Sequence, residues 1–213
     1  MKSIEFINVK KSIKNKEILK NISVKLECGK IYGFFGRNGS GKTMLFRAVC
    51  GLIKPTSGEI HINGKTLHKD MSFPENVGVI IESPGFWEYY TGFKNLKLLA
   101  SIKRKISDEQ IRSSIERVGL NPDDDRVFKK YSLGMKQRLA IAQAIMEEPD
   151  LLILDEPTNA LDEQGINLVR KILLEEKKRG TTILIASHNK EDIELLSDVK
   201  FRMNDGRLEQ FNG

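Results

Sequence analysis

Eight residues in the first quarter of the chain have the types and the spacing needed to hold a triphosphate. They run from Gly36 to Thr43, Gly-Arg-Asn-Gly-Ser-Gly-Lys-Thr, and fit the pattern G-x-x-x-x-G-K-[ST]. Glycines let the backbone come close enough for its N–H groups to converge on phosphate oxygens. The Lys42 ammonium can reach the outer phosphates, and the Thr43 hydroxyl can ligate Mg²⁺. The nucleotide-binding residues expected from this pattern are Asn38, Gly39, Ser40, Gly41, Lys42, Thr43 and Met44.

The segments on either side of residues 36–43 have the local structure that such a loop requires. Residues 31–35 form an apolar run of strand length, and residues 44–50 have the composition of a helix whose positive N-terminus would face the anion. The alternative is a chance glycine-rich turn. Four constrained positions match by accident in roughly one chain of this length in a hundred. The strand before and the helix after therefore favour a phosphate-binding loop.

A pair of carboxylates follows a second apolar strand. Residues 151–154 are apolar throughout, and Asp155 and Glu156 come directly after them, at the carboxyl edge where α/β sheets place ligands. We expect Asp155 to hold the Mg²⁺ that it shares with Thr43, and Glu156 to accept a proton from a water in line with the terminal phosphate. Taken alone, the pair could be a solvated acidic turn, but the upstream loop favours the catalytic interpretation.

A third segment carries another candidate anion site. A run of apolar residues with helical spacing follows residues 131–138, which are Tyr-Ser-Leu-Gly-Met-Lys-Gln-Arg. The hydroxyl of Ser132 and the N–H of Gly134, at the start of that helix, would make a second anion site. By itself, this octapeptide indicates only an ordinary N-capped helix.

Together, these three segments resemble the nucleotide-binding subunits of ATP-binding cassette (ABC) transporters, and the resemblance covers essentially the whole chain. Residues 132–137 are similar to the signature motif of that family, a close variant of Leu-Ser-Gly-Gly-Gln. In the family this motif closes over ATP held by the phosphate-binding loop of a second subunit, which implies a head-to-tail dimer with two MgATP between the subunits. The residues implied to act across that dimer are Ser132, Leu133, Gly134, Met135, Lys136 and Gln137.

Two further positions match the family. Residues 159–162 are similar to the D-loop, in which Asp162 would help to bridge the two nucleotide sites. His188 matches the switch histidine that contacts the terminal phosphate. A lone histidine after a strand is usually a surface residue, but its place after the last core strand favours the functional interpretation. His61 and His68 have no such context, and we expect both to be exposed.

The chain departs from the family at Glu82, where the family usually has a glutamine that reaches Mg²⁺ and the attacking water. A carboxylate can ligate Mg²⁺ and accept a hydrogen bond from water, but it cannot donate as an amide does. It also adds a third acidic group beside Asp155 and Glu156, so that their ionisation is coupled. We hypothesise that Glu82 is a metal ligand and catalytic residue that relays the nucleotide state without abolishing hydrolysis. Together with residues 132–135, residues 81–86 resemble the branch that exports, or confers resistance to, bacitracin-like and lantibiotic peptides.

A second departure lies at Ile13, where the family commonly has an aromatic side chain that stacks on adenine. A branched aliphatic side chain can contact the base, but it contributes less stacking energy. We therefore expect Ile13 to contact the base and discrimination between ATP and GTP to be weak.

The pattern of strands and helices predicts one domain with an α/β fold. Strands that alternate with helices in the second half indicate βαβ crossovers and a parallel sheet, whereas alternation in the first part and the Asn63-Gly64 turn predict an antiparallel layer. The predicted fold is an α/β P-loop NTPase (RecA-like) with a parallel-sheet core, an N-terminal antiparallel β layer and a helical subdomain insertion. Its parts are the β-rich residues 1–85 with the phosphate-binding loop, a helical subdomain at about 86–137, and the core at 138–213.

The helical segment contains two features that can be compared with a structure. Ser107 and Gln110 have the spacing of a capping box. An aromatic cluster, defined here as Phe86, Trp87, Tyr89 and Tyr90, has two interpretations. It forms either the core of the helical subdomain or a groove that receives a short helix of a membrane subunit. The sequence does not separate these alternatives.

Composition excludes several classes of protein. The chain has 213 residues, of which 39% are hydrophobic and 30% charged, as in ordinary globular proteins. No apolar run approaches the length of a membrane-spanning helix, and residues 1–6 turn polar too early for a signal peptide. Cys28 and Cys50 lie outside any metal-ligand spacing and are expected to be free thiols in a cytosolic chain. The net charge of +6 is scattered along the chain, which is typical of a solvated surface.

We therefore expect an ATPase, cytoplasmic and peripheral on the inner face of the cell membrane. It would dimerise with an identical or related ATP-binding subunit and power transmembrane permease subunits that export antimicrobial peptides or drugs. The alternative is a non-transport ABC-type ATPase that acts on nucleic acid. Such proteins usually carry a long coiled coil before the signature, whereas this insertion has only about fifty residues, so no nucleic acid partner is expected. A kinase or GTPase with the same loop is disfavoured by the Asp155-Glu156 pair, residues 132–137 and His188.

Overall fold

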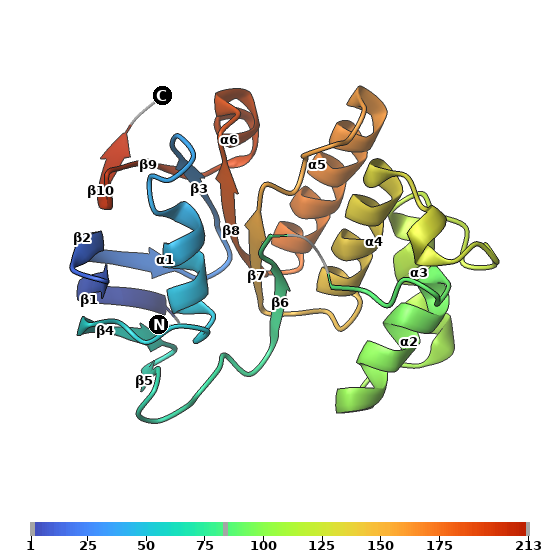
Figure 1. Cartoon of the computed structure of the whole chain (residues 1–213), viewed down its shortest axis with the longest axis horizontal. Helices are drawn as coiled ribbons and strands as arrows, with labels where there is room; N and C mark the ends of the chain where they lie inside the picture. The colour runs from blue at the N-terminus through green and yellow to red at the C-terminus, as the bar shows by residue number, and fades with distance from the viewer. Residues whose placement is uncertain (1–2, 83–84, 212–213) are drawn as a thin grey trace.

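Two β-sheets with a helix packed between them make up the β-rich half of the protein (Figure 1). The computed structural model describes residues 3–82 and 85–211. The first sheet is antiparallel, with strand order β2-β1-β4-β5. Positive φ angles at Asn63 and Gly64 make the tight turn between β4 and β5, as the sequence predicts. The strands of this sheet are β1 (Ser3–Ile13), β2 (Lys16–Glu27), β4 (Ser57–Ile62) and β5 (Lys65–Thr66).

The second sheet is mainly parallel and has the strand order β10-β9-β3-β8-β7-β6. Strands β9, β3, β8, β7 and β6 run parallel, and β10 pairs with β9 as an antiparallel edge strand. The strands are β3 (Ile31–Phe35), β6 (Val77–Ile80), β7 (Leu151–Asp155), β8 (Thr182–Ser187), β9 (Val199–Asn204) and β10 (Arg207–Phe211). The predicted fold class, with its parallel core and antiparallel layer, is confirmed.

Both faces of the parallel sheet are covered. Leu151 and Ile153 of β7 pack with α1 and the antiparallel sheet in one core cluster, whereas Leu152 and Leu154 point into a second cluster with the remaining helices. Because both faces of β7 are buried, no position of the strand faces water, and residues 151–154 are therefore all apolar. The helices are α1 (Lys42–Val49), α2 (Gly92–Lys103), α3 (Asp108–Arg117), α4 (Leu133–Ile145), α5 (Glu163–Lys178) and α6 (Lys190–Leu196), with a short 3₁₀ helix η1 (Phe128–Lys130).

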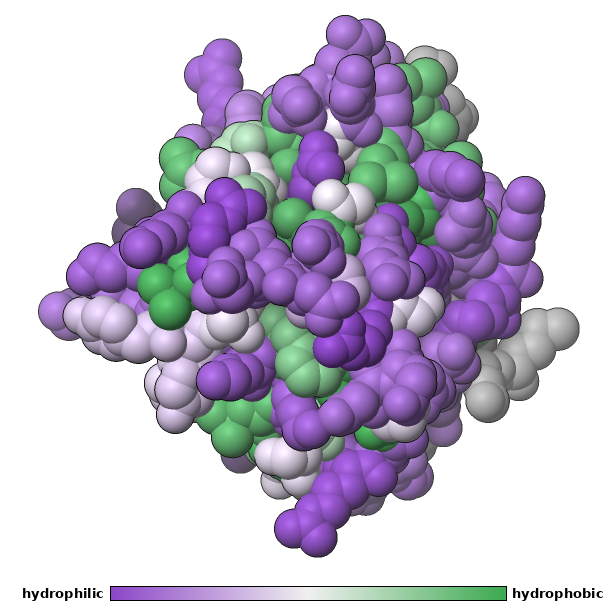
Figure 2. All heavy atoms as spheres, turned by 90° about the vertical axis from the view of Figure 1, so that its right-hand side faces the viewer, coloured by the Kyte–Doolittle hydropathy of each residue, from purple (hydrophilic) through white to green (hydrophobic). Residues whose placement is uncertain are grey.

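Helices α2 and α3 lie at the end of the molecule farthest from the antiparallel sheet (Figure 1). The predicted capping box begins α3, because Ser107 accepts from the Gln110 N–H at 3.4 Å and Gln110 accepts from the Ser107 N–H at 2.9 Å. The face at this end is mostly hydrophilic with separate hydrophobic patches (Figure 2). The predicted boundary between residues 137 and 138 falls inside α4, and the division into subdomains stays a prediction.

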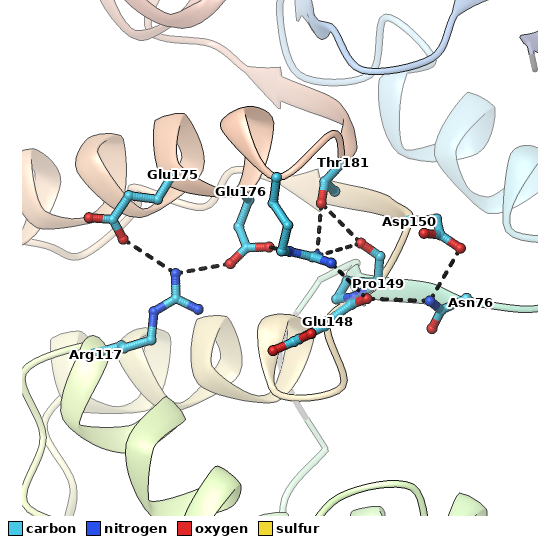
Figure 3. A network of polar contacts seen from close by, with 9 residues as sticks. Asn76, Arg117, Glu148, Pro149, Asp150, Glu175, Glu176 and Thr181 are labelled. Carbon is cyan, nitrogen blue, oxygen red and sulfur yellow. Dashed lines mark hydrogen bonds and ion pairs between the residues drawn. The ribbon is translucent and has the colours of Figure 1, made fainter.

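An ion network joins α3 to α5 (Figure 3). Arg117, at the end of α3, approaches Glu176 at 2.9 Å and Glu175 at 3.4 Å. Glu176 also binds Arg179 at 2.8 Å, and its side chain is only 3% exposed. This buried carboxylate therefore has a cation on each side, one from the helical segment and one from the parallel-sheet half.

Candidate active site

The loop between β3 and α1 has the conformation that the glycine pattern predicts. Gly39 and Gly41 have φ angles of 79° and 110°, which favour glycine because a Cβ atom is strained there. Gly41 is the N-cap of α1, and no side chain accepts a hydrogen bond at this cap. The N–H groups of the first helical turn are thus available to an anion, and they carry the positive end of the helix dipole.

Lys42 lies inside this loop. Its side chain is 6% exposed, and Nζ donates a hydrogen bond to the Gly36 carbonyl oxygen at 2.6 Å. The same nitrogen lies 3.9 Å from Glu156 Oε1. A buried ammonium surrounded by oxygen atoms is held in place at the position where the sequence pattern puts the outer phosphates.

Thr43 and Asp155 meet where α1 packs against the end of β7. The Thr43 hydroxyl donates to Asp155 Oδ2 at 2.5 Å. Burial raises the pKa of the Asp155 carboxyl, and the charge of Glu82 raises it further, whereas the Thr43 hydrogen bond, Lys42 and Arg47 lower it. The ionised carboxylate is thus under-compensated by its surroundings, and a cation would stabilise it.

The two carboxylate oxygens of Glu156 differ in their hydrogen bonding. Oε2 accepts from Ser187 Oγ at 3.3 Å and lies 2.8 Å from His188 Nδ1. Oε1 is buried and has no hydrogen-bond partner among the described residues. The backbone of Glu156 has a φ of 52°, a conformation that costs a non-glycine residue on the order of 1–2 kcal/mol. An oriented carboxylate with a free acceptor atom can take a proton from a nearby water.

A cleft of about 890 Å³ brings most of the predicted site residues together. Its lining includes the phosphate-binding loop, the carboxylates of Asp155 and Glu156 at the end of β7, and the start of α4. Ile13, which was predicted to contact the base, is not part of this lining. Ile18 does line the cleft, and the sequence did not predict it as a site residue. The residues that line the cleft are Ile18, Asn38, Gly39, Ser40, Gly41, Lys42, Thr43, Met44, Glu82, Phe128, Leu133, Lys136, Gln137, Asp155, Glu156, Asn159 and Ala160.

The residues similar to the signature motif begin α4. Ser132 is the N-cap, and its hydroxyl accepts from the Met135 N–H at 3.2 Å. Leu133 follows with 72% of its surface exposed. The Gln137 amide instead turns inward and donates to the carbonyl oxygens of Pro157 at 3.0 Å and Glu156 at 3.3 Å. Gln137 therefore ties α4 to the segment after β7 in its own chain.

The predicted residues Ser132, Gly134, Met135, Asp162 and His188 are not among those that line the cleft. Asp162 is the N-cap of α5 and accepts from the Gly165 N–H at 2.9 Å. The expectation that His61 and His68 are exposed is wrong, because both are partly buried. His61 Nε2 lies 2.9 Å from Glu59 Oε2, and His68 Nε2 lies 3.3 Å from a backbone carbonyl oxygen.

Glu82 follows the strand next to β7, and its carboxylate pairs with Arg47 of α1 at 2.8 Å. Nothing in the sequence linked these two residues, because the contact joins a helix and a loop far apart in the chain. Within the described residues, no three or more His, Cys, Asp or Glu side chains converge on a metal position. The Thr43 hydroxyl and the Asp155 carboxylate nevertheless fit Mg²⁺, which takes oxygen ligands and is usually held by one or two carboxylates plus the phosphates of a substrate.

One member of the aromatic cluster packs in the core of the helical segment, and the other three lie at the surface. Phe86 is partly buried and packs edge-to-face on Phe128, with the ring centroids 5.1 Å apart. The other three side chains are exposed, Trp87 by 47%, Tyr89 by 73% and Tyr90 by 44%. Phe86 thus belongs to the core, and the other three form an aromatic surface patch.

Comparison with known proteins decides the family. The profile described as "ABC transporter" matches residues 19–159. The chain is 58% identical over 206 residues to the uncharacterized ABC transporter ATP-binding protein YybJ of Bacillus subtilis (strain 168), and the match covers 97% of this chain and 94% of YybJ. The chain belongs to the ABC transporter family. It is the ATP-binding ATPase subunit of a transporter.

Two further relatives of this ABC ATPase support the resemblance to the bacitracin and lantibiotic branch. The bacitracin transport ATP-binding protein BcrA of Enterococcus faecalis is 42% identical, over 96% of this chain and 67% of BcrA. The lantibiotic transport ATP-binding protein SrtF of Streptococcus pyogenes is 37% identical, over 94% of this chain and 86% of SrtF. Some relatives are thus considerably longer than the region that matches.

Solved structures share the fold of this ABC ATPase. The dimeric post-hydrolysis structure of the ATP-binding cassette MJ0796 with ADP and Pi has a TM-score of 0.84, with 23% identity and 99% of each chain covered. A structure of an ATP-binding subunit of an ABC transporter has a TM-score of 0.87, with 26% identity, and covers 98% of this chain and 89% of that chain. Helices long and apolar enough to cross a membrane are absent from residues 3–82 and 85–211.

Proposed function

We propose that this ABC ATPase dimerises head to tail around two MgATP and powers separate permease subunits that export antimicrobial peptides. The observation that carries the proposal is the open cleft, which has the phosphate-binding loop on one wall and the start of α4 on another. Leu133, at the N-terminus of α4, is 72% exposed. A second copy would cover this surface and bring its own phosphate-binding loop to the α4 N-terminus.

The side chains of the cleft divide the work of hydrolysis. Lys42 and the N–H groups of the first turn of α1 bind the phosphates, and Glu156 takes a proton from the attacking water through its free Oε1 atom. His188 lies 2.8 Å from Glu156 Oε2, would orient this carboxylate, and would contact the terminal phosphate. Thr43, Asp155 and Glu82 would hold Mg²⁺, which when bound neutralises the charge on the phosphates.

Residues outside the phosphate site complete the proposed sandwich. Asp162 would bridge the two nucleotide sites, and residues 132–137 of the partner copy would close over the nucleotide. Ile18 lines the cleft beside the phosphate-binding loop, so we assign it, together with Ile13, to the base. The aliphatic character of both residues supports weak discrimination between ATP and GTP.

The proposed substrate and the proposed partner are inferred from the names of two relatives. BcrA is named for bacitracin transport and SrtF for lantibiotic transport, so the permease is proposed to move an antimicrobial peptide or a similar drug. The exposed patch of Trp87, Tyr89 and Tyr90 suits contact with that permease. The complex would lie on the inner face of the cell membrane, where the excess of basic residues suits an anionic leaflet.

Trapping the nucleotide tests the proposal. Glu156→Gln removes the proton acceptor while keeping the shape of the side chain, so ATP remains bound and the dimer persists. With saturating MgATP, the particle mass measured by light scattering is expected to double from the 24.2 kDa of one chain. ATP hydrolysis is expected to fall by at least about 100-fold, the scale of a lost general base.

A matched control separates nucleotide binding from dimerisation. In the double variant Glu156→Gln with Ser132→Arg, the bulky side chain blocks the start of α4 but leaves the phosphate-binding loop intact. This variant is expected to bind fluorescent ATP and to stay monomeric. If Glu156→Gln alone remains monomeric at saturating MgATP, even beside its permease, the proposal of an ATP sandwich fails.

A further inference from the structure

Arg47 is a cation at the metal side of the cleft that the catalytic scheme does not use. Its Nη2 atom lies 2.8 Å from Glu82 Oε1, and the Arg47 side chain is 35% exposed. Glu82 has a φ of 60°, so the backbone turns sharply after β6 and directs this side chain toward α1.

The position of Arg47 follows from the geometry of α1. Arg47 lies one helical turn after Thr43, and residues four apart share one face of a helix. Thr43 already binds Asp155 at the end of β7. Glu82 follows β6, which pairs with β7 in parallel register, so that Ile80 lies opposite Leu154. The same face of α1 therefore meets Asp155 and Glu82 at two neighbouring strand ends.

Two cations partly balance the three carboxylates around the proposed metal position. Glu82, Asp155 and Glu156 all line the cleft. Lys42 lies near Glu156, at 3.9 Å, and Arg47 pairs with Glu82. A glutamine at position 82 would give Arg47 no charge to pair with, so this ion pair is a direct consequence of having a carboxylate there.

We propose that Arg47 is a positioning residue that competes with Mg²⁺ for the Glu82 carboxylate and thereby sets how tightly the nucleotide complex holds the metal. The proposal deepens the proposed function and rests on MgATP binding at this cleft. While Arg47 holds Glu82, the Oε1 atom of the carboxylate is engaged in the ion pair. A metal that binds Glu82 must first break this ion pair, so the pair weakens metal binding and gives Glu82 two alternative positions.

Metal binding, rather than turnover, tests the proposal. The probe is Mn²⁺, titrated into the protein bound to a non-hydrolysable ATP analogue, with free Mn²⁺ counted by electron paramagnetic resonance. Arg47→Gln is expected to tighten Mn²⁺ binding about three- to fivefold, the scale of a partly exposed ion pair. Arg47→Lys keeps a cation and is expected to stay close to the unmodified protein.

A double-variant cycle isolates the pair. In the Glu82→Gln background, Arg47→Gln is expected to change Mn²⁺ binding much less, because the competing carboxylate is gone. Lys54→Gln removes an exposed lysine that is not part of the cleft lining and controls for net charge. Equal tightening in both backgrounds, or none in either, overturns the role of Arg47. Failure of the unmodified protein to bind the analogue at all would instead overturn the proposed function.

Discussion

The Asp155 carboxyl is held in the cleft at a cost in stability. Burial raises its pKa, and the neighbouring charge of Glu82 adds to this effect. A folded-state pKa above the unfolded value means that ionisation favours the unfolded chain, so the cost grows as the pH rises above the ordinary value of 3.8. Asp155→Asn is thus expected to melt a few degrees higher at pH 7 in EDTA while losing ATPase activity.

The dependence on pH distinguishes this cause from a packing effect. The advantage of Asp155→Asn is expected to shrink as the pH falls toward 4, because the wild-type carboxyl then becomes protonated. Asp125→Asn makes the same chemical change at an exposed position and is expected to leave the melting temperature unchanged. A variant that melts lower than the wild type at pH 7 would show that the Thr43 hydrogen bond outweighs the burial of charge.

Single residues also show what the sequence could and could not predict. Lys42 and Thr43 were recognisable because their chemistry depends on spacing within one loop. The pairing of Arg47 with Glu82 and the presence of Ile18 in the cleft depend on which segments the fold brings together, and no local pattern carries that information. For the same reason the sequence did not predict that the Gln137 amide donates to a carbonyl oxygen of its own chain; its role across a dimer stays a prediction.

At the scale of elements, the link between α3 and α5 depends on one buried charge. Glu176 is 3% exposed and binds Arg117 and Arg179. Glu176→Gln keeps the shape but leaves two arginines without their shared anion, and is expected to destabilise the protein by about 2–4 kcal/mol. Hydrogen exchange of α3 amides is expected to accelerate, because Arg117 loses its main anchor on α5.

Glu175→Gln provides a matched control on the same helix. Glu175 is 45% exposed and meets Arg117 at a longer distance, 3.4 Å. Its loss is expected to cost less than about 1 kcal/mol, as for other exposed pairs. Equal losses for the two substitutions would mean that burial of Glu176 adds nothing to the link.

Elements that depend on short-range patterns were predictable, and their pairing was only partly so. The Asn63-Gly64 turn and the capping box at Ser107 are local, and both were correctly predicted. The continuous apolar run of residues 151–154 predicted a strand, and the structure shows β7 buried throughout. The order β3-β8-β7-β6 is set by long-range packing, which composition does not encode locally.

The whole molecule depends on α1 packing between two sheets, and Cys50 at its C-cap reports on that packing. Cys50 is 5% exposed, and burial raises the pKa of its thiol to about 12. Alkylation at pH 8 is thus expected to modify the partly exposed Cys28 quickly and Cys50 only when the sheets separate. MgATP at 100 times its Kd is expected to slow the Cys50 reaction about 100-fold, because the nucleotide binds only the folded state.

The same thiol makes global stability fall in alkali. An unfolded cysteine ionises above about pH 9, whereas the folded thiol does not ionise until about pH 12. The unfolded state therefore gains about 1.4 kcal/mol for each pH unit across this window, and the stability contributed by the neutral thiol is lost as the pH rises. Cys50→Ala is expected to remove this slope in urea denaturation, although it lowers stability at pH 7 through the cavity that it leaves. If Cys50 instead reacts as fast as Cys28 at pH 8, the two sheets do not close over α1 in solution.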